Sequence, residues 1–375
     1  MTQRWDIFCR VIDNFGDIGV CWRLANTLTD DQNKTVRLWV DNLHALQSLK
    51  PTIDLSKNIQ LVDNIEIILW NDTFTPTQMA DVVIEAFGCE LPPKYLEKMP
   101  SQPPVWINLD YFSAEPWVAS FHAMPSKQPN GLDKYFFYPS ILANTGGLMR
   151  EADLLEAKQA FLAHNTHQAW LNNFAQTQLN SFKISLFCYE NSVILPLIEA
   201  WKNSDLAIEL FVPQGRIVST LEQALRIKLQ QHQPIQQGNL TLHLLPFLPQ
   251  ADYDKLLWSC DLNFVRGEES MVRAQWAGKP FIWHIYPTDD LAHWDKLNAF
   301  YQVYSQALNP TAQACLIAFN RIWNQVEHAN FDNQAWLNLR GHFDEYHAHS
   351  EYWIQQLEKL GDLTSNLVKF VQSKV

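Results

Sequence analysis

The sequence predicts an α/β protein of two domains, each built around a mainly parallel sheet. At 375 residues the chain exceeds one ordinary core, and 47% hydrophobic residues supply material for two. Short apolar runs alternate with amphipathic stretches, as in βα units. The pattern starts again near Lys183. We therefore expect one domain at residues 1–178 and a second at 179–357, with a helix over 358–375 crossing back to complete the first domain.

The first half opens with an apolar run from Ile7 to Ile12, which predicts a strand followed by a turn. A helix is expected near Gly19 to Leu28. Further apolar runs predict strands at Val36–Val40, Ile65–Leu69, Val82–Ala86 and Val105–Leu109. A helix-rich stretch from Glu151 to Thr177 is expected to connect the two halves.

The second half repeats this order of elements. Lys183 to Cys188 predicts a strand, Tyr189 to Asn191 a turn, and Val193 to Trp201 a helix. Strands are expected near Ile208 to Val212 and Leu240 to Leu244. The last part of the chain, from Asn333 to Val375, has the apolar spacing of helices.

Composition argues against several classes of function. The formal net charge of −12 disfavours general nucleic-acid binding, because like charges repel phosphate. No apolar run approaches the roughly 18 residues of a membrane span, and the segment Met1 to Asp6 lacks the profile of a secretory signal. The six cysteines are scattered and form no CxxC pair. We therefore expect a cytoplasmic protein with reduced thiols and no membrane contact.

Several strong motifs are absent, including the dinucleotide turn GxGxxG, the Walker loop, HExxH and GxSxG. The sequence Asp252-Tyr253-Asp254 matches an acidic pair that holds a metal in some glycosyltransferases. Because it stands directly before Lys255-Leu256-Leu257, we interpret it as helix N-capping by Asp252 or Asp254. The sequence therefore predicts no metal site.

A strand, a polar turn and a helix follow one another between Leu245 and Pro287. The helix ends at Gly278-Lys279-Pro280. This order resembles the donor-binding half of the GT-B glycosyltransferases, in which two Rossmann-like domains face each other across a cleft. In that fold the amino terminus of the helix holds the diphosphate through exposed amides and the helix dipole. The alternative is an ordinary βαβ unit, and Gln275 stands where many GT-B enzymes carry an acid for the ribose.

Two aspartates, Asp13 and Asp17, flank a glycine-containing turn after the first strand. In open α/β folds catalytic groups collect at the carboxyl ends of strands, so one carboxylate could point toward an interdomain cleft. The alternative is that Asp17 caps the following helix and Asp13 is a turn residue. Composition leaves both interpretations open.

Three stretches give a closer resemblance: residues 7–25, 264–270 and 283–287. Together they are similar to the protein-arginine rhamnosyltransferases of bacterial elongation factor P, the EarP family. The resemblance spans essentially the full chain. It implies an inverting, metal-independent GT-B enzyme that takes rhamnose from dTDP-β-L-rhamnose and needs no further cofactor. The implied acceptor is one arginine in the KOW-like first domain of elongation factor P, whose modification helps to rescue ribosomes stalled at polyproline.

The resemblance also implies roles for individual residues. Asp17 would activate the acceptor guanidinium, Asp13 would orient the acceptor or support Asp17, and Glu268 would be the third essential carboxylate. The implied dTDP-rhamnose contacts are Tyr189, Phe247, Tyr253, Arg266, Gly267, Glu269, Ser270 and Tyr286. The implied acceptor loop also contains Asn14, Phe15, Gly16 and Gly19.

Two other functions compete with this one. A transferase acting on a lipid or glycan is disfavoured because no basic amphipathic helix suits a membrane surface. A nucleotide-sugar-binding protein without turnover is disfavoured because Asp13, Asp17 and Glu268 are all present, and a binder has no use for three acids there.

Overall fold

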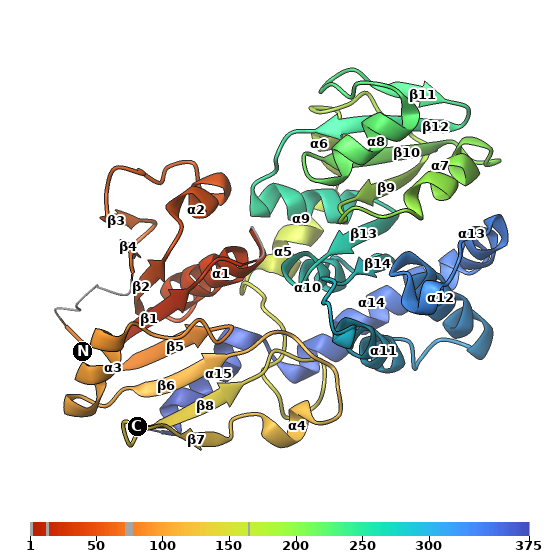
Figure 1. The fold of residues 1–375 in the computed structure, drawn as a ribbon. Helices are drawn as coiled ribbons and strands as arrows, with labels where there is room; N and C mark the ends of the chain where they lie inside the picture. The colour runs from red at the N-terminus through yellow and green to blue at the C-terminus, as the bar shows by residue number, and fades with distance from the viewer. Residues whose placement is uncertain (1–2, 13–14, 72–77, 164–165, 375) are drawn as a thin grey trace. The chain divides into compact units, whose positions relative to one another are not determined.

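The computed structural model describes residues 3–12, 15–71, 78–163 and 166–374 and divides into two compact α/β units (Figure 1). The first unit combines residues 1–152 with 357–375, and the second holds residues 153–356. The predicted fold class, two domains with parallel sheets, is therefore confirmed. The division at Ala152 lies earlier in the chain than the expected boundary after residue 178.

Within its described residues, the first unit holds an eight-stranded sheet in the order β3-β4-β2-β1-β5-β6-β8-β7. The two edge strands β3 and β7 run antiparallel to their neighbours, and the other pairs are parallel. The strands are β1 (Arg4–Cys9), β2 (Thr35–Val40), β3 (Ile59–Val62), β4 (Ile65–Leu69), β5 (Val82–Ala86), β6 (Val105–Leu109), β7 (Pro125–Lys127) and β8 (Asp133–Phe137).

Strand β1 begins and ends earlier than the sequence predicts. It spans Arg4–Cys9 instead of residues 7–12, and its side chains from Trp5 onward are buried. The next amides bind side chains, because Val11 N donates to Asp41 Oδ1 at 3.0 Å and Ile12 N to Asp17 Oδ2 at 2.8 Å. The chain after Cys9 is thus a loop held by two carboxylates.

The helices of the first unit are α1 (Gly16–Asp30), α2 (Leu43–Leu49), α3 (Pro93–Lys98), α4 (Val118–Phe121) and α15 (Leu363–Gln372). Helix α15 comes from the end of the chain and packs within this unit, as Figure 1 shows. Thr364 Oγ1 lies 2.8 Å from Thr27 Oγ1, and the Phe370 ring packs against Tyr135 and Phe137 of β8. The last helix therefore packs within the first domain, as the sequence predicts.

The second unit holds a six-stranded sheet within its described residues, in the order β11-β12-β10-β9-β13-β14. All neighbours are parallel except β11, which runs antiparallel to β12. The strands are β9 (Phe182–Leu186), β10 (Ile208–Pro213), β11 (Ile235–Gln237), β12 (Leu240–Leu245), β13 (Leu262–Arg266) and β14 (Phe281–His284). This order brings the loops after β9, β13 and β14 together at one edge.

The helices of the second unit begin before residue 179, the predicted start of the second domain. They are α5 (Leu154–Leu162), α6 (Thr166–Leu171), α7 (Ile194–Lys202), α8 (Ile217–Leu225), α9 (Gln250–Ser259), α10 (Glu269–Ala277), α11 (Ala292–Tyr304), α12 (Pro310–Trp323), α13 (Asn333–Arg340) and α14 (Phe343–Leu360), of which the last crosses the unit boundary after Gln356. On α5, Phe161 packs against Trp258 of α9, and Lys158 Nζ donates to Ala277 O at 3.0 Å. These contacts make α5 part of the second unit.

None of the helices in the described part of the chain is long and apolar enough to cross a lipid bilayer.

Candidate active site

Asp17 lies at the carboxyl end of β1, in the first turn of α1, and is 3% exposed. Its Oδ2 accepts the 2.8 Å hydrogen bond from Ile12 N, and its Oδ1 accepts one from the Tyr111 hydroxyl at 3.1 Å. Tyr111 follows β6 and stacks on Phe87, which follows β5, with ring centroids 4.5 Å apart. Three neighbouring strand ends thus converge on one buried carboxylate.

The first turn of α1 tests the alternative that Asp17 is the helix cap. The N-cap position belongs to Phe15, whose side chain forms no capping bond. Gly16 is the first helical residue, and Gly19 N donates to Phe15 O at 2.9 Å. The helix therefore begins before the predicted Gly19, and Asp17 stands inside it. Two residues of the expected site, Asp13 and Asn14, lie outside the described residues.

In the second unit, the turn from β13 into α10 has a glycine in the left-handed conformation. Gly267 has φ +60°, a conformation that favours glycine, and its N donates to His284 O at 3.0 Å. Its carbonyl accepts from Trp283 Nε1 at 2.6 Å. Ser270 Oγ accepts from Arg266 N at 2.9 Å. The nine-residue α10 therefore starts from a rigid turn, with its positive dipole end at Glu269.

Arg266 is held beside this turn by aromatic rings. Its guanidinium carbon lies 4.1 Å from the centroid of Phe187 and 5.1 Å from that of Tyr189. Its Nη1 donates to Cys188 O at 3.4 Å. The Tyr189 ring in turn packs against Tyr286, 5.6 Å away. Loops after β9, β13 and β14 thus fix one cation at the start of α10.

The two glutamates of the turn have different partners. Glu268, at the N-cap of α10, forms an ion pair with Lys296, whose Nζ lies 3.1 Å from Oε1. Glu269 accepts from the Gln250 amide at 3.1 Å. Glu268 is therefore positioned by a cation, and one contact of Glu269 is with a neutral amide.

The residues expected to contact the base differ in exposure. Phe247 follows β12 and is 38% exposed. Tyr253 is buried on α9, with its ring centroid 5.4 Å from that of Phe187. Burial, reinforced by the charge of Glu269, raises the pKa of Tyr253. Phe247 is thus the side chain of this pair available for stacking.

His284 ends β14 and is 6% exposed. Burial, and then the charge of Arg266, lower the pKa of His284 to about 3. The imidazole is therefore neutral at pH 7, and its ring packs against Tyr189 with centroids 5.3 Å apart.

The expectation that Asp252 or Asp254 caps a helix is wrong. Helix α9 begins at Gln250 with Pro249 at its N-cap, so both acids lie inside it. Asp252 pairs with Lys255 at 2.9 Å, and the buried Asp254 binds Arg273 through two hydrogen bonds of 2.8 Å. Among the described residues, no group of three or more His, Cys, Asp or Glu side chains could hold a metal ion.

Gln275 is turned into the core of the second unit. It is 2% exposed, and its Oε1 accepts from Trp353 Nε1 of α14 at 2.9 Å. Near the carboxyl end of α10, Gln275 therefore links this helix to α14.

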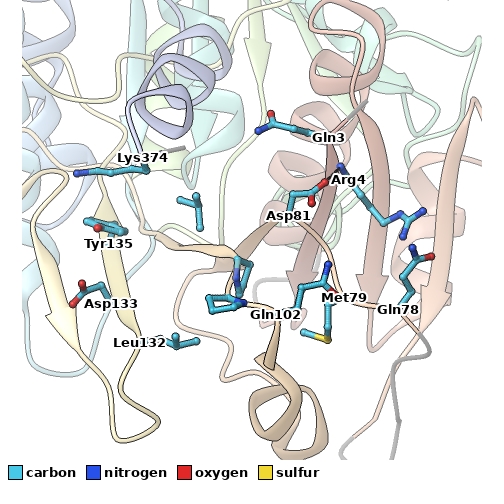
Figure 2. Close-up of a pocket in the computed structure, with 13 residues that line it drawn as sticks. Gln3, Arg4, Gln78, Met79, Asp81, Gln102, Leu132, Asp133, Tyr135 and Lys374 are labelled. Atoms are coloured by element: carbon cyan, nitrogen blue, oxygen red, sulfur yellow. Dashed lines mark hydrogen bonds between the residues drawn. The ribbon is translucent and has the colours of Figure 1, made fainter. Parts of the chain in front are cut away.

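Each unit also contains a pocket. One of about 430 Å³ in the second unit is lined by Tyr189, His284, Tyr286 and neighbouring residues, so it adjoins the Arg266 turn. A larger one of about 800 Å³ lies in the first unit (Figure 2). Arg4, Val105 and Asp133 line it at the amino ends of β1, β6 and β8, the sheet edge opposite Asp17. Because active sites of open α/β folds lie at carboxyl ends, we take Asp17 as the candidate site of the first unit and the Arg266 turn as the candidate site of the second.

Comparison with known proteins identifies the family. Residues 5–372 match the family described as Elongation-Factor P (EF-P) rhamnosyltransferase EarP. The chain is 43% identical over 381 residues to the protein-arginine rhamnosyltransferase of Pseudomonas putida, covering 100% of both proteins. It is 40% identical to that of Pseudomonas aeruginosa, covering 98% of both.

The chain belongs to the EarP family. It is therefore an enzyme, a glycosyltransferase. A solved structure from work on EarP-mediated arginine glycosylation of translation elongation factor EF-P superimposes with a TM-score of 0.72 and 32% identity, covering 100% of both chains. A UDP-glucose:anthocyanidin 3-O-glucosyltransferase in complex with UDP, at TM-score 0.52 and 11% identity, shares the fold alone.

Three residues that contact the candidate site residues were not predicted from the sequence. Phe187 follows β9 directly, and its place two residues before Tyr189 is a signal that could have found it. Tyr111 follows β6 in the same way. Lys296 contacts Glu268 from α11, 28 residues later in the chain, and no local sequence pattern predicts this ion pair. The roles of the predicted residues stay predictions.

Proposed function

We propose that this enzyme transfers rhamnose from dTDP-β-L-rhamnose to one arginine in the KOW-like domain of elongation factor P. The support for the acceptor is membership of the EarP family together with the full-length likeness to a structure from work on arginine glycosylation of EF-P. Because this acceptor is a translation factor, the reaction would take place in the cytoplasm and would activate the factor for ribosomes stalled at polyproline.

The observation that carries the donor half of the proposal is the Arg266 turn. A leaving nucleoside diphosphate develops negative charge, and fixed donors that face it lower the barrier. Arg266 and the amino terminus of α10 supply a cation and a positive dipole end at one place. We propose that these two features, and no metal ion or further cofactor, stabilise the departing dTDP. Phe247 would stack on the thymine.

The acceptor chemistry explains the need for acids. An arginine guanidinium is protonated at physiological pH, and its nitrogens are weak nucleophiles. Carboxylates can bind it, orient one nitrogen and accept a proton as the new bond forms. In the proposed step the anomeric C–O bond breaks, a C–N bond forms on the opposite face, and the proton passes to Asp17. The single displacement inverts the anomeric carbon. Asp13 and Glu268 would bind the remaining guanidinium groups.

The test is incubation of the protein with dTDP-β-L-rhamnose and elongation factor P, followed by intact mass measurement and fragmentation. The proposal expects a gain of one deoxyhexose on one arginine, and no gain on a factor in which that arginine is lysine. Magnetic resonance of the product should show an inverted anomeric configuration. An unmodified factor would refute the acceptor, and a reaction that stops in EDTA and resumes with magnesium or manganese would refute the metal-free step.

A further inference from the structure

The start of α10 combines features with opposite effects on an incoming anion. A helix amino terminus with Arg266 suits an anion, yet the same turn carries the adjacent acids Glu268 and Glu269. An incoming diphosphate would meet the Glu268 carboxylate at the N-cap of α10 unless a cation offsets its charge.

Lys296 supplies that cation. Its ammonium lies 3.1 Å from Glu268 Oε1, and the two side chains are 25% and 21% exposed. Lys296 thus offsets the charge of Glu268 at the place where an anionic leaving group is expected.

The lysine is held by rigid structure. It lies on α11, whose side chains Leu297 and Phe300 are buried. The Phe300 ring packs 5.4 Å from Trp283 of β14, and the Tyr301 hydroxyl accepts from Trp283 N at 3.3 Å. Strand β14 pairs with β13, which leads into the turn. A continuous path of packed elements therefore positions α11, which carries Lys296, relative to the turn with Glu268.

We propose that Lys296 is a positioning residue: by neutralising Glu268, it allows a carboxylate and a nucleoside diphosphate to share the amino terminus of α10. This inference rests on the proposed function, because it takes that helix terminus as the diphosphate site. Lys296 acts through Glu268 and not by contact with the phosphates. Its effect on nucleotide affinity must therefore depend on whether Glu268 is charged.

The experiment is a double-mutant cycle read by calorimetry with dTDP, using the wild-type chain, Lys296→Met, Glu268→Gln and the double variant. Lys296→Met should weaken dTDP binding by about tenfold, since it uncovers one carboxylate beside the anion. In the Glu268→Gln background the same substitution should change affinity by less than about twofold. Lys296→Arg should restore nearly all of the affinity, and the loss should shrink as salt increases.

Each outcome separates the proposal from its alternatives. Equal losses in both backgrounds would mean that Lys296 contacts the diphosphate directly, and no loss in either would make the pair purely structural; both overturn the inference. Thermal melting shows whether the variants are folded, and Lys296→Gln is the second variant if Lys296→Met is not. If the wild-type chain itself does not bind dTDP, the proposed donor site fails, and with it the basis of the inference.

Discussion

Substitution of Asp17 by asparagine tests whether the carboxylate acts in catalysis or only stabilises the fold. Asparagine has nearly the same shape, and both of the hydrogen bonds described above can persist. Its Oδ1 can accept from Ile12 N, and its amide can donate to the Tyr111 oxygen, because a hydroxyl also accepts. What disappears is the negative charge and the capacity to take a proton.

The expected cost to folding is modest. Hydrogen bonds to a charged group contribute about 1.5–3 kcal/mol and neutral ones about 0.5–1.5 kcal/mol, so two weakened bonds cost about 1–3 kcal/mol. Loss of a carboxylate from the first turn of α1 adds about 0.3–1 kcal/mol. If Asp17 is the general base, turnover should fall roughly 10²–10⁴-fold, whereas dTDP affinity should stay near wild type.

The assay is rhamnosylation of elongation factor P under single turnover, with thermal melting and dTDP calorimetry on the same preparations. Tyr111→Phe is the matched control, because it removes the hydroxyl from Asp17 Oδ1 but leaves the carboxylate. It should lower turnover by about tenfold or less. A folded Asp17→Asn variant with near wild-type turnover would refute the proposed base. Equal losses in both variants would shift the role from the charge to the hydrogen-bond network.

Three further predictions follow from the second unit. Phe247→Ala should weaken dTDP binding by about 1–3 kcal/mol with little effect on melting, because this ring is 38% exposed; unchanged affinity by calorimetry would remove it from the site. His284, with its pKa lowered from 6.5 to about 3, contributes stability that is complete above pH 6.5 and is lost as pH falls. In denaturant titrations, the free energy of unfolding of the wild type should fall by about 2 kcal/mol more between pH 7 and pH 5 than that of His284→Phe. An equal fall in both proteins would contradict this. Gly278→Ala should destabilise by about 1–3 kcal/mol, because φ is +64° and the new Cβ would lie 2.6 Å from Ile354 Cδ1; Gly341→Ala, with its nearest neighbour at 3.4 Å, should melt like the wild type.

The central strands were predicted well because they are rich in aliphatic residues. Runs such as Ile65–Leu69 and Val82–Ala86 are aliphatic, and the structure has strands at the same residues. The short edge strands Pro125–Lys127 and Ile235–Gln237 were not anticipated, since they are largely polar and form only by pairing with a neighbour. The shift of β1 has a similar origin, because Ile12 is apolar but 67% exposed.

The site was predictable where chemistry is carried by neighbours in the chain. The turn at Arg266 and the helix after it were anticipated, including the glycine that the turn requires. Contacts made through space were not. The hydroxyl of Tyr111 reaches Asp17 only because β1 and β6 end at the same sheet edge. The position of Lys296 depends on the packing of α11, which is separated from the turn by α10 and β14.

The first unit is assembled from both ends of the chain, and this sets an order of events during synthesis. The second unit, residues 153–356, is continuous and can form as soon as it has left the ribosome. The unit that carries Asp17 lacks α15 until translation has finished, so its emerged sheet must wait with an uncovered apolar surface around Thr27 and Phe137. A premature stop near residue 356 would therefore spare the second unit and damage the first, although most of the first unit is made earlier.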